Sequence, residues 1–391
     1  MQKYFDNAAT SFPKPREVID SIAEFHNKCG ASPGRGAYSN AKRATDILDE
    51  CRELLCILVN APTPSNCIFT QNCSDALNLS IGGIATHWIE QDKPVHIITT
   101  VMDHNSVLRP LHALQKRGVE FTVISADSKT GIISPEDIEK AITSNTKLVS
   151  IAHGSNVTGT IQNVAEIGRI CKDIPFLVDA AQTMGHTPID IDAMQIDLLA
   201  FPGHKGLLGP SGTGGLIMKP GMERYLSPIR FGGTGNKSES PYQPETLPEK
   251  YEIGSHNILG IVGLSAGIKW ILKQGVEKLH GHELQLCNAF IEQCKSIHSI
   301  NIIGPQTIDN RCGVFSITDW KNPHDLARKI EHDSGCCVRA GLHCAPFTHE
   351  TMGTAKHGGT VRCSFGPFHT TTDIQHFTES LKRTTLQEVL A

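Results

Sequence analysis

The alternation of short apolar runs with helical segments between residues 67 and 218 constrains the fold of this chain more than any other feature. Runs such as 95–100, 148–152 and 176–179 are largely apolar and do not alternate with polar residues. Strands of this kind are buried on both faces, as happens in a mostly parallel sheet covered by helices on each side. We therefore expect an α/β fold built on a mostly parallel sheet.

The length of the chain indicates more than one domain. It has 391 residues, and a single core rarely grows beyond roughly 250–300 residues. The strand–helix alternation stops at segment 230–251, which contains three prolines and is typical of a linker or an active-site loop. We predict an N-terminal arm (1–15) that packs on the small domain, a large α/β domain (16–255) and a smaller α+β domain (256–391).

Composition argues against several classes of partner. The net charge is −4 and no basic block occurs, so a nucleic acid is an unexpected partner. No apolar run approaches the ~20 residues of a membrane span, and the N-terminus lacks the apolar region of a signal peptide. Thirteen cysteines in so long a chain predict reduced thiols and a cytoplasmic location. The histidines show no metal-binding spacing, so no metal site is expected.

One lysine stands where a strand is expected to end. An apolar run at 197–201 is followed by Pro202 and Gly203, and then by Lys205 with Gly206 after it. In a dry pocket such an amine loses its proton more readily and can form a Schiff base. The alternative is a solvated lysine in a turn.

Polar side chains also follow three other predicted strands. The carboxyl ends of parallel strands meet at one edge of the sheet, where ligands bind. Any one of these side chains could be structural, since an aspartate after a strand often caps the next helix. Together they favour a site at this edge, and they are His104 after 95–100, Asn156 after 148–152, and Asp179 with Gln182 at the end of 176–179.

A pyridine cofactor that carries an aldehyde and a phosphate would use all of these groups. The amine forms the Schiff base, and a carboxylate keeps the ring nitrogen protonated so that the ring withdraws electrons. Phosphate is bound by hydroxyls and by backbone N–H groups at a helix N-terminus. Cys73 and Ser74, at the start of a predicted helix, and His204 can serve there.

The chain resembles the class V aminotransferase family of pyridoxal-phosphate enzymes. More closely, it is similar to the group II cysteine desulfurases and selenocysteine lyases. Four segments carry the resemblance: 4–9 (Tyr-Phe-Asp-Asn-Ala-Ala), 201–209, 339–346 (Arg-Ala-Gly-Leu-His-Cys-Ala-Pro) and 361–364 (Val-Arg-Cys-Ser). The resemblance implies the type I fold of these enzymes, with a seven-stranded, mostly parallel sheet and a smaller α+β domain. It also implies a homodimer with shared sites.

The resemblance further implies a role for each candidate residue. Lys205 is the Schiff-base lysine, Asp179 pairs with the pyridinium, and His104 stacks on the ring and moves protons. The remaining implied contacts are Gln182 with the ring hydroxyl, Asn156 with the ring and the substrate carboxylate, Cys73, Ser74 and His204 with the phosphate, Ser255 with the phosphate of a neighbouring subunit, and Arg362, together with Arg339, with the substrate.

Two positions depart from the family pattern. Pro202 stands where the family has serine or threonine, and Cys73 replaces a usual threonine. A thiol is a poorer hydrogen-bond donor than a hydroxyl. We therefore expect fewer phosphate contacts than usual, on an unchanged fold.

Cys344 is the candidate nucleophile in the 339–346 segment. In the group II enzymes this cysteine attacks the substrate sulfur and becomes a persulfide, which requires a thiolate near a cation. Arg339 and His343 are candidate cations. The alternative is a buried, inert cysteine. Cys336, Cys337 and Cys363 are expected to pack in strands, with a relay role left open.

These observations predict a pyridoxal-phosphate-dependent cysteine desulfurase. It would convert L-cysteine to L-alanine and leave sulfur on Cys344, from which an acceptor protein could take it. A selenocysteine lyase or a C–S lyase on the same scaffold is the alternative among enzymes. A sulfur-carrying scaffold without the cofactor is the alternative from another class, and the intact set of Lys205, Asp179 and His104 disfavours it.

Overall fold

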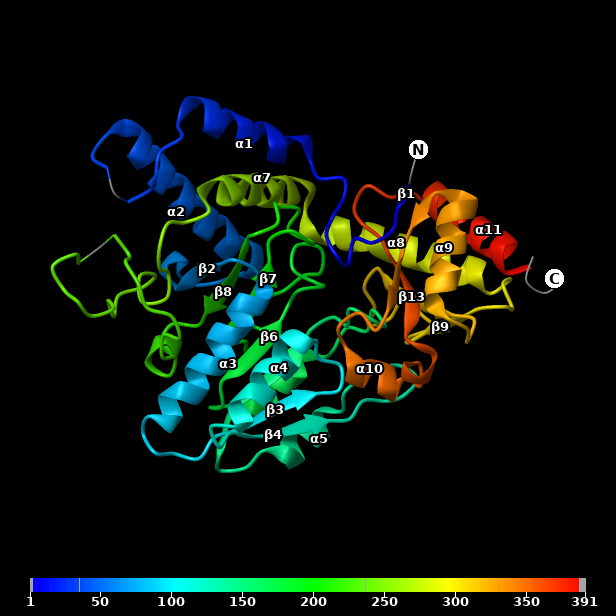
Figure 1. The fold of residues 1–391 in the computed structure, drawn as a ribbon, viewed down its shortest axis with the longest axis horizontal. Helices are drawn as coiled ribbons and strands as arrows, with labels where there is room; N and C mark the ends of the chain where they lie inside the picture. Colours follow the sequence, from blue (N-terminus) through cyan, green and yellow to red (C-terminus); the bar gives the residue numbers. More distant parts are fainter. Residues whose placement is uncertain (1–2, 35, 236, 387–391) are drawn as a thin grey trace.

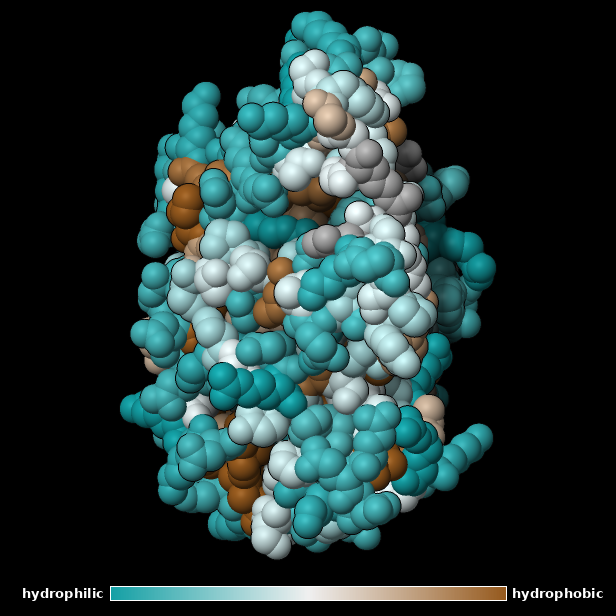
Figure 2. Space-filling model, turned by 90° about the vertical axis from the view of Figure 1, so that its left-hand side faces the viewer, coloured by the Kyte–Doolittle hydropathy of each residue, from teal (hydrophilic) through white to brown (hydrophobic). Residues whose placement is uncertain are grey.

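The computed structural model describes residues 3–34, 36–235 and 237–386. A large sheet with its helices and a smaller sheet with its own helices lie next to each other, and the first and last described elements, β1 and α11, lie beside the smaller one (Figure 1). The side of the molecule that carries α1 and α2 is mostly hydrophilic, with separate apolar patches between the polar side chains (Figure 2).

The large sheet has seven strands and is mostly parallel, as predicted. Only β8 runs antiparallel to both of its neighbours. In spatial order the strands are β2 (Cys67–Thr70), β8 (Gly214–Met218), β7 (Leu198–Pro202), β6 (Phe176–Asp179), β5 (Thr146–Ala152), β3 (His96–Thr100) and β4 (Glu120–Ile124).

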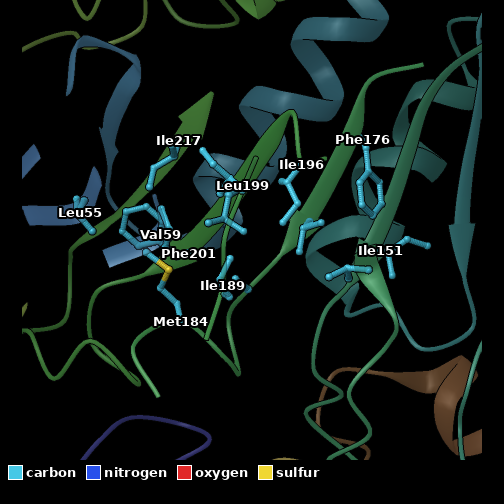
Figure 3. Packing of buried hydrophobic residues seen from close by; sticks show 14 of the residues in the cluster. Leu55, Val59, Ile151, Phe176, Met184, Ile189, Ile196, Leu199, Phe201 and Ile217 are labelled. Carbon is cyan, nitrogen blue, oxygen red and sulfur yellow. The ribbon is translucent and has the colours of Figure 1, made fainter. Parts of the chain in front are cut away.

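Both faces of this sheet are buried, which explains why its strands are largely apolar. In β7, Leu199 and Phe201 point into one core, while Leu198 and Ala200 point into a second core on the other face. Figure 3 shows the first core, in which Leu199 and Phe201 lie near Ile217 of β8 and the side chains of α2. A strand between two cores needs an apolar residue at every position, not at every second one.

Helices cover each face of the large sheet. The first core includes residues of α2 (Ser39–Val59), α5 (Pro135–Ala141), α6 (Val164–Cys171) and α7 (Ile258–Gln274), and α1 (Arg16–Lys28) packs on α7. The second core lies under α3 (Cys73–Ile89) and α4 (Asn105–Gln115). Helix α7 thus packs with the helices of the large sheet, although it follows the domain boundary predicted at residue 255. That boundary stays a prediction.

The smaller sheet is antiparallel, in the order β12 (Arg339–Gly341), β13 (Thr360–Ser364), β10 (Val314–Thr318) and β9 (Asn301–Ile303). Its core includes residues of α8 (Val276–Cys294), α9 (Pro323–Ser334) and α11 (Thr371–Leu386). Helices α7 and α8 are separated at Gly275, whose φ of 87° ends α7 and starts α8. Glycine adopts this left-handed conformation without the strain of a Cβ.

The N-terminal arm is joined to the smaller sheet region. Strand β1 (Lys3–Tyr4) pairs in parallel with β11 (Cys336–Cys337), and Lys3 forms a 2.9 Å ion pair with Asp373. Cys336 and Cys363 are buried in the core of this region. Within the described residues, no helix has the length and hydrophobicity needed to cross a membrane.

Candidate active site

A cavity lies where β3, β5, β6 and β7 end, at the carboxyl edge of the large sheet. It encloses about 560 Å³ of empty space, part of it open to solvent. The structure brings together eight of the predicted residues in its walls, which are Cys73, Ser74, His104, Asn156, Asp179, Gln182, His204 and Lys205. Ser255, Arg339, Cys344 and Arg362 do not line it.

Lys205 is the amine of this cavity. Burial lowers the pKa of Lys205, and the nearby guanidinium of Arg362 lowers it further. No hydrogen bond engages the Lys205 amine within the part of the chain that the structure describes. A free amine that releases its proton easily is suited to attack an aldehyde.

Gly203 and Gly206, which flank His204 and Lys205, pack closely against other segments of the chain. A Cβ at Gly203 would collide with Thr213, and one at Gly206 would collide with the Met184 carbonyl and His186. Both glycines therefore allow close packing of the chain itself. The close packing fixes the backbone on either side of the lysine.

Asp179 ends β6 with one carboxylate oxygen already bound. Its Oδ1 accepts hydrogen bonds from the backbone N–H of Ala181 at 2.9 Å and from the thiol of Cys73 at 3.4 Å. Neither bond uses Oδ2, and Asp179 lines the cavity. Burial raises the pKa of Asp179, whereas these two donors and the Lys205 charge oppose that rise. A carboxylate oxygen that remains available suits a pyridinium N–H.

Cys73 therefore bonds Asp179 through its side chain. Burial and the adjacent Asp179 charge raise the pKa of the Cys73 thiol well above its usual value, so the thiol keeps its proton and acts as the donor. The predicted phosphate contact of Cys73 then depends on its backbone N–H.

His104 caps α4 and is neutral. Its Nδ1 accepts the backbone N–H of Ser106 at 3.1 Å, which leaves the ring proton on Nε2. Burial, and then the charge of Lys205, lower the pKa of His104 to about 4. A neutral ring can stack on a flat cofactor, and in this tautomer its Nε2 can give a proton but cannot accept one.

The start of α3 supplies an anion site in the wall of the cavity. Asn72 caps the helix by accepting the backbone N–H of Asp75, and the Ser74 and Ser106 hydroxyls lie 2.6 Å apart. The buried Nδ1 of His204 has no partner. An uncommitted imidazole, two hydroxyls and a helix N-terminus fit a phosphate. With Lys205 and Asp179, the donor set fits pyridoxal phosphate.

The N-terminal arm is hydrogen-bonded to the residue that precedes Lys205. This contact was not predicted from the sequence. The His204 carbonyl accepts hydrogen bonds from the Ser11 N–H and hydroxyl, both at 3.0 Å, and from Thr10 and Lys14. Burial lowers the pKa of Lys14 to about 8. Nothing in the local sequence of the arm indicates this partner, about 190 residues away.

Arg362 lies on β13 and is almost fully buried. Its Nη2 binds Asp6 of the arm at 2.7 Å, its Nη1 binds the Asn156 carbonyl at 3.2 Å, and its Nε has no partner. Burial lowers the pKa of Arg362, and Asp6 opposes that shift. Asp6 was not predicted as a site residue, and its carboxylate stands where an anion would meet the guanidinium. Binding of a substrate carboxylate to Arg362 stays a prediction.

Cys344 lies on the short loop between β12 and α10 (Pro346–Thr351). It is the exposed one among the thirteen cysteines, all of which are free thiols. The adjacent His343 is buried, and burial together with the Arg362 charge lowers its pKa well below the usual value. His343 is therefore neutral, which leaves Arg339 as the nearby cation of the two predicted.

Ser255 is exposed and lies outside the cavity of its own chain. It lines a separate hollow with Gln71 and Asp75, beside the start of α3. The sequence placed Ser255 at the site of a neighbouring subunit, and that assignment stays a prediction.

Comparisons with known proteins agree with this architecture. Residues 3–377 match the family model described as aminotransferase class-V. The chain is 37% identical over 385 residues to a probable cysteine desulfurase of Methanothermobacter thermautotrophicus, covering 97% of this chain and 94% of that protein. It is 36% identical over 380 residues to one of Pyrococcus abyssi, covering 96% and 92%. The apo structure of a cysteine desulfurase from Thermococcus onnurineus superposes with a TM-score of 0.91, at 32% identity, over 99% and 95% of the two chains.

Proposed function

Because the chain belongs to the aminotransferase class-V family, we propose that it is a pyridoxal-phosphate-dependent cysteine desulfurase acting on L-cysteine. The observation that carries the proposal is the exposed thiol of Cys344, on a loop whose backbone is hydrogen-bonded to residues at the cofactor cavity. Relatives described as probable cysteine desulfurases support it over nearly the whole chain.

The cavity residues would hold the cofactor and prepare the substrate. Lys205 supplies the amine that links to the cofactor aldehyde, and Asp179 Oδ2 accepts the ring N–H. Ser74, His204 and the N-terminus of α3 hold the phosphate. When bound, pyridoxal phosphate withdraws electrons from the α-carbon of an amino acid. Lys205 then takes the α-proton, or His104 takes it once its Nε2 has given up its own proton.

Sulfur transfer requires a second nucleophile, which Cys344 provides. As a thiolate it attacks the sulfur of bound L-cysteine, so that an S–S bond forms while the Cβ–S bond breaks. The electron pair of that bond stays with the carbon skeleton, which takes up a proton and leaves as L-alanine. The balance is one thiol and L-cysteine giving one persulfide and L-alanine. Because Cys344 is exposed, a thiol of an acceptor protein can reach the persulfide.

A homodimer would complete the phosphate site. Ser255 lines a hollow of its own beside the start of α3 and not the cavity, which fits a contact with the phosphate of a second copy. The segment that leads to it carries two exposed aromatic side chains, Phe231 (69%) and Tyr242 (82%). A large exposed aromatic is commonly covered in an interface.

A cytoplasmic location fits the thiols. All thirteen cysteines are free, and the proposed reaction depends on one of them staying reduced until substrate arrives. Thiols persist in the reducing cytoplasm and are oxidised in secretory compartments.

Replacing the nucleophile tests the proposal. We expect Cys344→Ala to keep the visible absorption of the lysine-bound cofactor and to bind L-cysteine, but to form no alanine. In the unchanged protein, mass spectrometry after a cysteine pulse should find one extra sulfur on the Cys344 peptide, removable by a thiol. Cys337→Ala, which changes a half-buried thiol of the same domain, is the matched control and should behave like the unchanged protein.

Two outcomes would contradict the proposal. Sulfide release by Cys344→Ala at the unchanged rate, with pyruvate in place of alanine, would identify a C–S lyase. If the extra sulfur is found on the Cys337 or Cys363 peptide, the proposed desulfurase activity still holds, but Cys344 is not the nucleophile.

A further inference from the structure

The loop that carries Cys344 has a strained backbone. His343 and Cys344 both have positive φ, 47° and 60°, and neither is glycine. Successive side chains of the loop alternate between exposed and buried: Leu342 and Cys344 face solvent, whereas His343 and Ala345 are buried. Left-handed residues other than glycine persist only where surrounding contacts hold them.

The His343 ring is bonded to Thr360 of β13, and two further hydrogen bonds reach the loop backbone from the large α/β part of the molecule. The side-chain amide of Asn156 donates to the His343 carbonyl at 2.7 Å. The backbone N–H of Asn105, directly after His104, donates to the Cys344 carbonyl at 2.8 Å. Both carbonyls belong to the two left-handed residues. The thiol is therefore positioned by hydrogen bonds to its own backbone and to that of the residue before it.

Asn156 also contacts the buried Arg362, through its backbone carbonyl. Its backbone carbonyl accepts Arg362 Nη1 at 3.2 Å, and its side chain is nearly buried in the wall of the cavity. One residue therefore connects the nucleophile loop, the cavity and the guanidinium. A substitution of the Asn156 side chain therefore alters the support of the loop but leaves Lys205 and Arg362 in place.

We propose that Asn156 is a positioning residue for Cys344, holding the nucleophile loop at the cavity through its hydrogen bond to the His343 carbonyl. This role rests on the proposed function and is distinct from the substrate contact expected from the sequence. Loss of the amide N–H leaves the His343 carbonyl without its donor, and the left-handed turn loses one of its two bonds to the large α/β part of the molecule.

The role can be separated from substrate binding by measuring the carbon chemistry and the sulfur chemistry independently. Exchange of the α-hydrogen of L-alanine in D₂O requires Lys205 and the cofactor but no sulfur transfer, so it does not involve Cys344. For Asn156→Asp, which keeps the shape and removes the N–H, we expect alanine formation from L-cysteine to fall at least tenfold. We expect the α-hydrogen exchange of L-alanine to stay within threefold.

A third measurement does not depend on activity. Amide hydrogen exchange should become at least tenfold faster in peptides covering 341–346 and Asn105, because Ala345 and Asn105 donate hydrogen bonds within and to this loop. Asn156→Ala is measured alongside, since a carboxylate beside Arg362 could change the guanidinium as well. Asn66→Asp, at a buried asparagine outside the cavity whose amide nitrogen has no partner, is the control and should alter none of the three measurements.

The outcomes distinguish this role from the proposed function. If α-hydrogen exchange falls as much as alanine formation in both variants, Asn156 acts on the substrate and the positioning role is wrong. Unchanged amide exchange in the loop would also overturn it. If the unchanged protein forms no alanine from cysteine, the proposed function fails. Faster amide hydrogen exchange of the loop in the variants would still support the positioning role of Asn156.

Discussion

The cofactor cavity and the nucleophile loop are held in place by different means. The cavity residues stand at the ends of buried strands, and burial shifts the pKa of Lys205, Asp179 and His104. The nucleophile loop has an exposed thiol, two left-handed residues and hydrogen bonds that come from another part of the molecule. The cavity is thus fixed by the core of the sheet, whereas the position of the thiol is fixed by a few polar contacts.

This difference implies that the carbon chemistry and the sulfur chemistry can fail separately. Loss of the Lys205 amine or the Asp179 charge should slow both, because in the proposed reaction sulfur transfer follows α-proton removal. A change in the loop should spare the first. Substitutions at Lys205, Asp179 and Cys73 should have progressively smaller effects on the cavity. Their effects can be compared with those of Cys344→Ala and Asn156→Asp.

Replacement of Lys205 should have the largest effect. Lys205→Ala removes the one lysine amine that the described residues place in the cavity wall, so no covalent link to the cofactor can form. We expect the visible absorption of the linked cofactor to disappear. Both alanine formation and α-hydrogen exchange should fall by at least about a thousandfold. Cofactor that can still be trapped by a reductant on another lysine would show that Lys205 is not the linking residue.

A smaller loss is expected when only the charge at Asp179 is removed. Asp179→Asn keeps the shape, and its amide can still accept the Ala181 N–H. The ring nitrogen would lose the anion that holds its proton, so both reactions should slow by about a hundredfold. The cofactor should stay bound, as measured by its absorption after gel filtration. Turnover close to that of the unchanged protein would show that Asp179 serves only as the hydrogen-bond acceptor of the Ala181 backbone N–H.

The smallest change concerns the thiol beside Asp179. Cys73→Ala removes one of the two donors to Oδ1, and a thiol is a weak donor. We expect turnover and the cofactor dissociation constant to change by only about twofold to threefold, the lower end of the effect of a hydrogen bond. Cys73→Ser, which keeps a donor, should restore both values. A serine variant no better than the alanine variant would show that the contact is packing alone.

Much of the cavity could be predicted because strand ends are visible in the sequence. The apolar runs locate the strands, and parallel strands deliver the residues after them to one edge, so His104, Asn156, Asp179 and Lys205 meet there. The sequence did not indicate that Cys73 would face Asp179. Which way a side chain points at a helix start depends on the neighbouring strands, here β6.

The partners that cross between distant segments could not be predicted. Asp6 binds Arg362 across 356 residues, and Ser11 binds the His204 carbonyl across 193. Such pairs have no periodicity and no shared motif, because a hydrogen bond depends on distance in space. The packing of α7 on α1 and α2 was likewise hidden, since an apolar helix does not specify which surface buries it.

The sequence by itself determined the α/β alternation, the edge of the sheet where ligands gather and the chemical identity of the amine, the carboxylate and the thiol. These follow from local patterns, because burial requires apolar residues and each reaction requires a particular functional group. Only the tertiary structure decided that His343 is buried and neutral, that Oδ2 of Asp179 remains available and that Asn156 holds the loop of Cys344. Burial, pKa and hydrogen-bond partners depend on which distant segments meet, and folding alone brings those segments together.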